Sequence, residues 1–144
     1  MPSVTYSYGN LQQQGPSLEV HFHIPDILTK KYKEEGKQVP EPVICKAIVD
    51  TGASGCTIKP EIPEKLGLKP IGTTKINTAS HKDNECYQYF LRMVIPAQGI
   101  FWEGIFVGTP LDGQDISCLI GRDLLNISVL VYNGPMNQIT LSLL

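Results

Sequence analysis

The pattern of apolar and polar positions along the chain is mostly that of short β-strands. The clearest example is residues 18–24, where apolar and polar residues alternate strictly. The apolar face of this segment consists of Leu18, Val20, Phe22 and Ile24. The other predicted strands cover residues 43–49, 55–58, 75–78, 86–95, 100–107, 116–120, 129–132 and 139–144. Many short strands with few helical stretches predict an all-β domain.

Helical patterns are few and short. The first predicted helix lies within residues 26–36, with Asp26 as its N-cap and Gly36 as its stop. It belongs to an excursion at residues 25–42 that separates the first two strands. Two shorter helical segments are predicted at residues 60–68 and 122–125. The excursion is interpreted as an inserted loop of the domain.

The predicted domain covers residues 17–144, preceded by an N-terminal extension at residues 1–16. The extension is rich in Tyr, Ser, Gln and Gly without a period, so we expect it to be extended or partly mobile. A chain of 144 residues is long enough to bury one core of its own.

Charge and hydropathy narrow the class of partners. A net charge of −2 gives no electrostatic reason to expect nucleic acid or an anionic membrane surface. No apolar run is long enough to span a bilayer, and the first residues do not have the pattern of a signal peptide. We therefore expect a cytoplasmic protein.

Metal ligands and disulfides are not predicted. The four cysteines are Cys45, Cys56, Cys86 and Cys118. They are not spaced as a zinc knuckle or a redox pair, so buried, reduced thiols are favoured over a disulfide or metal role. His21 and His23 share one strand face at a spacing that suits a metal, but no further ligand is near in sequence. A solvated strand face is the favoured interpretation.

The candidate chemistry is concentrated in residues 47–57. An apolar strand stops abruptly at Asp50 and is followed by small, turn-forming residues. An acid at the end of a buried strand is unfavourable unless it is hydrogen-bonded or shares a proton. The Thr51 hydroxyl is suited to locking the loop, and Gly52 allows a close approach of backbone.

A second motif at residues 118–125 reads Cys-Leu-Ile-Gly-Arg-Asp-Leu-Leu. Together the two motifs resemble the retropepsin-like (retroviral-type) aspartic proteases, over most of the chain from Leu18 to Leu144. The resemblance implies a single-lobed acid-protease barrel in which the second motif crosses behind the catalytic acid. The residues it assigns are Asp50 as the catalytic acid, Thr51, Gly52 and Ala53 as loop support, and Ile120, Gly121 and Arg122 as second-motif support.

The resemblance also implies how the reaction would proceed. The chain has one Asp-Thr-Gly, so the pair of acids must come from the Asp50 residues of a homodimer. Two close carboxylates share one proton and activate a water that attacks a peptide carbonyl, without a cofactor or a metal. Thr51 is expected to bind across the two-fold axis, and Gly52 to accept backbone hydrogen bonds from a peptide or protein substrate.

The expected flap over the substrate is the hairpin at about residues 75–95. Its polar tip supplies the candidate substrate-binding residues, which are Thr78, Ala79, Ser80 and His81. This assignment follows from position in the chain, because the tip lacks the Gly-rich sequence of viral enzymes.

Two positions depart from relatives of this type. Ala53 stands where pepsin-like enzymes commonly carry Ser, whose hydroxyl stabilises the ionised pair of acids. Its absence predicts activity at mildly acidic to near-neutral pH. Ser54 stands where viral enzymes often carry an Asp that pairs with the Arg of the second motif. Another acid or backbone carbonyls are then expected to bind Arg122.

Three other interpretations were considered. In the first, Asp50 merely ends a strand and the likeness of both motifs is accidental. In the second, the fold is the same but the domain is a catalytically silent, dimeric peptide-binding module. In the third, Asp50 is the nucleophile of a phosphohydrolase, which we set aside because further acids and a cation site are missing near it. The apolar segment 139–144 is the candidate strand for the dimer sheet.

Overall fold

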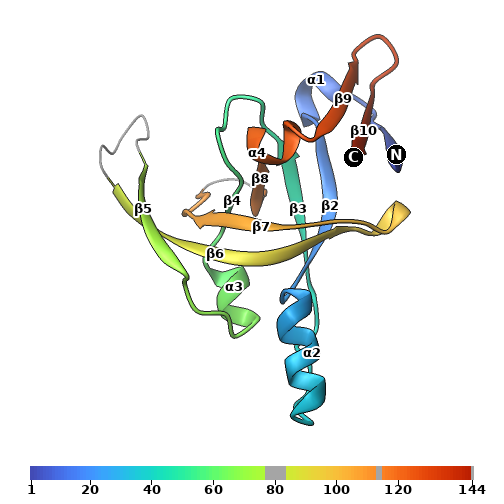
Figure 1. Cartoon of the computed structure of the whole chain (residues 1–144). Coiled ribbons are helices and arrows are strands. Elements are labelled where there is room, and N and C mark those ends of the chain that lie inside the picture. Colours follow the sequence, from blue (N-terminus) through green and yellow to red (C-terminus); the bar gives the residue numbers. More distant parts are fainter. Residues whose placement is uncertain (77–83, 113–114, 144) are drawn as a thin grey trace.

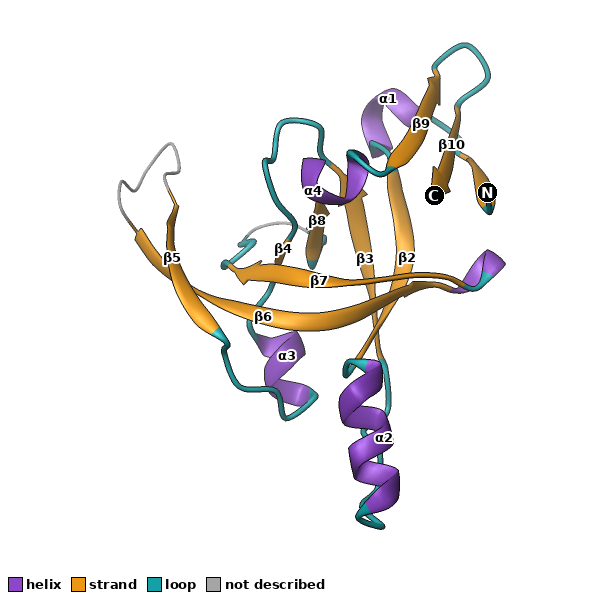
Figure 2. Cartoon of the chain, in the orientation of Figure 1, coloured by secondary structure: helices purple, strands orange, loops and turns teal. Residues whose placement is uncertain are grey.

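The structure is a computed structural model that describes residues 1–76, 84–112 and 115–143. Most of it is β-structure arranged in two sheets (Figures 1 and 2). The strands of the larger sheet, in spatial order, are β2 (Ser17–His23), β3 (Val43–Val49), β8 (Cys118–Ile120), β4 (Thr57–Ile58), β7 (Ile100–Gly108), β6 (Asn84–Ile95) and β5 (Gly72–Ile76). The smaller sheet has the order β1 (Ser3–Ser7), β10 (Gln138–Leu143) and β9 (Ser128–Asn133). The all-β prediction is confirmed.

The larger sheet closes on itself. β6 pairs with β7 along its length and also with β2, where His21 lies opposite Val94 and His23 opposite Arg92. Six strands, from β2 round to β6, therefore form a ring, and β5 extends from β6 outside it. Closure removes most free strand edges from this part of the molecule.

The core fills this ring. The predicted apolar face of β2 is buried, and Phe22 meets Phe106 of β7 edge-to-face with ring centroids 5.2 Å apart. Strict alternation predicted this face correctly because the strand period is local. The buried positions of the strand and the residue after it are Leu18, Val20, Phe22 and Ile24.

Residues 1–16 contain an extended strand and a short helix. Residues Ser3–Ser7 form β1, which pairs antiparallel with β10, and α1 (Leu11–Gln14) follows. The Asn10 side chain caps α1 by accepting from Gln13 N, and Leu11 is buried with 1% of its surface exposed. The sequence did not predict this pairing, because the strand that pairs with β1 lies at the other end of the chain.

The excursion between β2 and β3 contains α2 (Asp26–Glu34), which projects from the barrel in Figure 1. Asp26 is the first helical residue, and Pro25 occupies the N-cap position instead. Gly36 has a φ of 69°, a left-handed conformation that ends the helix as predicted. The insertion lies at the start of β3, the end opposite to Asp50.

The remaining short elements connect strands. They are α3 (Glu61–Lys65), η1 (Pro96–Gln98) and α4 (Arg122–Leu125). Within the described residues, none of the helices has the length and apolar character needed to cross a membrane.

Candidate active site

Asp50 lies at the carboxyl end of two parallel strands. Val49 of β3 is in register with Ile120 of β8, and the Asp50 backbone N–H donates to the Ile120 carbonyl at 2.9 Å. The two sequence motifs, about 70 residues apart, therefore meet at one end of the barrel. The loop from Asp50 to Cys56 arches over this end between β3 and β4 (Figure 1).

The Asp50 side chain is partly exposed and is oriented by its own loop. The side-chain Oδ1 of Asp50 accepts from the Gly52 N–H at 2.9 Å. The backbone carbonyl of Asp50 accepts from the Ala53 N–H at 3.1 Å. A Cβ on residue 52 would lie 3.1 Å from that same Oδ1, so glycine suits the close approach. The carboxylate is thus fixed in orientation and open to a bound molecule.

Arg122 is held by carbonyls of the same loop. Its Nη1 donates to the Thr51 carbonyl at 2.8 Å, and its backbone N–H donates to the Ala53 carbonyl at 2.9 Å. Backbone carbonyls were one of the two expected partners in a chain with Ser54. Thr51 itself is exposed.

Gly121 packs directly on the loop. A Cβ at this position would lie 2.4 Å from the Gly55 carbonyl oxygen and 2.5 Å from its carbonyl carbon, well inside van der Waals contact. Only glycine therefore allows the second motif to cross this close to the Asp50 loop.

A model of the family described as aspartyl protease matches residues 39–124, which is more than half of the chain and includes both motifs. The chain belongs to the aspartyl protease family.

The fold agrees with this membership. The solved structure of a retropepsin-like aspartic protease from Rickettsia conorii aligns with a TM-score of 0.58 at 17% identity. The alignment covers 99% of this chain and 91% of that one. No curated protein matches the chain. The predicted retropepsin-like family and fold are therefore confirmed, and the family is one of proteases.

The sequence did not indicate the roles of two residues of this candidate site, Cys56 and Asp123. Asp123 accepts the Cys56 backbone N–H at 3.2 Å through Oδ2, and the Cys56 thiol at 3.0 Å through Oδ1. The Gly121 N–H in turn donates to Cys56 Sγ at 3.3 Å. The one available signal was that Asp123 is the acidic residue of the second motif, next to Arg122.

In the part of the chain that the structure describes, the other cysteines and the two histidines are not arranged to hold a metal. Cys86 and Cys118 are buried free thiols, and Cys45 is a half-buried one. His21 and His23 are half-buried rather than fully solvated, and His21 Nε2 lies 3.2 Å from a Glu19 oxygen. Across the described ranges, no three His, Cys, Asp or Glu side chains are grouped to hold an ion.

The predicted tip of the flap lies outside the described residues, and with it Thr78, Ala79, Ser80 and His81. The strands that lead to it are described: β5 and β6 form an antiparallel hairpin with Ile76 opposite Asn84.

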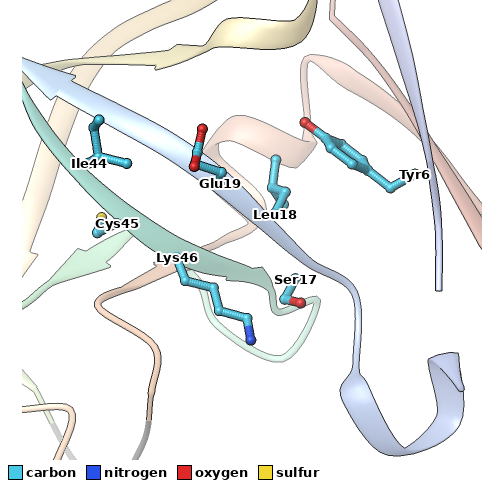
Figure 3. Close-up of a pocket in the computed structure, with 7 residues that line it drawn as sticks. All are labelled: Tyr6, Ser17, Leu18, Glu19, Ile44, Cys45 and Lys46. Atoms are coloured by element: carbon cyan, nitrogen blue, oxygen red, sulfur yellow. The ribbon is translucent and has the colours of Figure 1, made fainter. Parts of the chain in front are cut away.

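A cavity of about 470 Å³, which Asp50 does not line, lies over β2 and β3 (Figure 3). Tyr6 of β1 reaches over this cavity. Burial raises the pKa of the half-buried Cys45 thiol in its lining to about 12, which makes the thiol unreactive near neutral pH. Its lining residues are Tyr6, Ser17, Leu18, Glu19, Ile44, Cys45 and Lys46.

Proposed function

We propose that this aspartyl protease family member is a homodimeric aspartic endopeptidase, in which a water activated between two Asp50 carboxylates hydrolyses a peptide bond. The observation that carries the proposal is the Asp50 carboxylate, accessible and oriented, on a loop anchored by the second motif. Family and fold support the reaction class.

The reaction follows from the chemistry of paired acids. Two carboxylates close together share one proton, because both cannot remain ionised. The ionised one takes a proton from the bound water, whose oxygen attacks the peptide carbonyl. The protonated one donates a hydrogen bond to the carbonyl oxygen as negative charge develops there. Thr51, whose side chain is exposed, is placed across the two-fold axis in this scheme, and Gly52 and the hairpin tip at residues 78–81 contact the peptide.

The smaller sheet, formed by β1, β10 and β9 and called the terminal sheet from here on, supports association of two copies. β10 lies between β1 and β9, so its two edges are both occupied and it is not available to a partner, contrary to the sequence-based candidate 139–144. β9 is an edge strand with Val129 and Val131 each 50% exposed, and none of the three strands contains a charged residue. An uncharged, apolar edge is the kind that pairs with another chain.

A cytoplasmic location belongs to the same proposal. Buried and half-buried thiols without disulfide partners suit a reducing compartment. The expected substrate there is a peptide or a protein.

The decisive experiment is cleavage of a peptide library by the purified protein across pH 4 to 8, beside Asp50→Asn. We expect Asp50→Asn to fold and dimerise normally but to lose cleavage, because an amide cannot share the proton. Asp26→Asn, which removes an exposed acid on α2, is the matched control and should retain it.

Equal cleavage by wild type and Asp50→Asn would contradict the proposal. A folded dimer that binds peptides but does not cleave them would favour the silent binding module instead.

A further inference from the structure

The loop at residues 50–56 is attached to the second motif at both of its ends. Its first half is held by Arg122 and by the carbonyl of Ile120, as described above. Its second half is held by the three hydrogen bonds that join Cys56, Gly121 and Asp123, between 3.0 and 3.3 Å long. The Cys56 carbonyl also accepts from Val107 N–H of β7 at 3.0 Å.

We propose that Cys56 and Asp123 are positioning residues for the catalytic acid, which fix the second half of the loop while Arg122 fixes the first. This inference rests on the proposed peptidase function and deepens it.

The thiol of Cys56 acts in two directions. It donates to Asp123 Oδ1 and accepts from the Gly121 N–H, so it links a backbone amide to a carboxylate. Burial, and then the hydrogen bond to Asp123, raise the pKa of Cys56, so the donor proton is retained at working pH. An alanine here would remove both bonds and leave the buried Gly121 N–H without its acceptor.

The carboxylate of Asp123 faces only donors in this cluster. The Cys56 N–H, the Cys56 thiol and the Leu124 N–H at 2.8 Å all point to its two oxygens. An ionised carboxylate has acceptors alone, whereas the amide of an asparagine would present its NH₂ group to one of these donors. Asparagine is therefore expected to disturb this contact despite its similar size.

The expected consequence is catalytic rather than a loss of binding. The position of the loop sets how close the two Asp50 carboxylates lie, and hence how they share a proton and orient the water. A loop displaced by a fraction of an ångström should lower kcat and change the pH–rate profile. KM should change little, because a bound peptide contacts many other groups.

The test compares two cysteines. Cys56→Ala should lower kcat roughly tenfold or more, with KM within about twofold and an altered pH–rate profile. Cys45→Ala removes a half-buried thiol from β3, outside both motifs. It should lower the melting temperature but leave kcat and the pH–rate profile unchanged.

Two more variants keep the proposal falsifiable if Cys56→Ala does not fold. Cys56→Ser, whose hydroxyl also donates and accepts, should recover most of kcat, and Asp123→Asn should not. Equal kcat in the Cys56 and Cys45 alanine variants, or full kcat in Asp123→Asn, would overturn the positioning role while wild-type cleavage stands. Wild-type protein without Asp50-dependent cleavage would remove the peptidase function and this role together.

Discussion

At the scale of single residues, the site depends on how close two backbone segments approach. Gly121 and Gly55 touch, and the space between them does not admit a methyl group. The geometry of the Asp50 loop is therefore tied to the absence of a side chain at residue 121.

Gly121→Ala should reduce both stability and activity. The new Cβ would lie 2.4 Å from the Gly55 carbonyl oxygen, so backbone must move, and we expect the free energy of unfolding to fall by about 2 kcal/mol. Chemical denaturation and peptide cleavage measure the two effects. Gly9→Ala is the control, since its Cβ would lie 3.9 Å from its nearest described neighbour, the Gln14 side chain. Unchanged stability in Gly121→Ala would mean that the two segments are not in contact.

Ala53→Ser should move the pH–rate profile to the acid side, by up to roughly one pH unit. Both backbone polar groups of Ala53 are already engaged, with the Asp50 carbonyl and the Arg122 N–H, so the change adds a hydroxyl without disturbing the loop. A hydroxyl donated to the ionised pair would favour the charged form. The measurement is kcat/KM against pH for both proteins, and coincident profiles would contradict the idea.

Residue roles near the motifs were only partly predictable. The sequence identified Asp50 and its turn-forming neighbours because the signal is contiguous. It left two possible partners for Arg122, and the structure shows the Thr51 and Ala53 carbonyls. It missed Cys56 with Asp123, because that contact depends on the register of β4 against β8.

At the scale of elements, the terminal sheet has two edge strands, β1 on one side of β10 and β9 on the other. β9 follows α4 directly and so lies next to the second motif, whereas β1 forms the other edge (Figure 1). The row Thr5, Thr140 and Val131 crosses the sheet from one edge to the other. This row offers a matched pair of positions for testing which edge meets a partner.

Val131→Lys should yield a monomer and lose activity, because a charge on the β9 edge opposes pairing with a second copy. Thr5→Lys places the same charge in the same row on the β1 edge and should remain a dimer. Sedimentation equilibrium with activity measured at matched concentration tests both. Dimers of equal stability in the two variants would place the interface elsewhere.

Truncating β10 would not answer the same question. Its side chains Ile139, Leu141 and Leu143 are buried, and it holds β1 and β9 together. Loss of this strand is therefore expected to unfold the sheet and obscure any effect on association.

At the scale of the whole molecule, one chain forms one lobe that carries one Asp-Thr-Gly motif, with Asp50 as its acid. Ring closure between β2 and β6 and the parallel pairing of β3 with β8 bring the two motifs to the same end of the barrel. The inserted α2 lies at the opposite end of β3 and leaves this region clear (Figure 1). In the proposed mechanism, this single-lobed chain completes an acid pair only with a second copy.

The sequence by itself determined the all-β class, the buried face of β2, the bounds of β3 and α4, and the position of the acid. These features depend on patterns of a few neighbouring residues, such as alternation and turn chemistry. Tertiary structure alone decided that residues 3–7 pair with β10, that β10 is internal and β9 an edge, and that Asp123 binds Cys56. These contacts join partners 67 to 139 residues apart in the sequence, and local patterns do not specify which distant strand or hydrogen-bonding group a residue will meet.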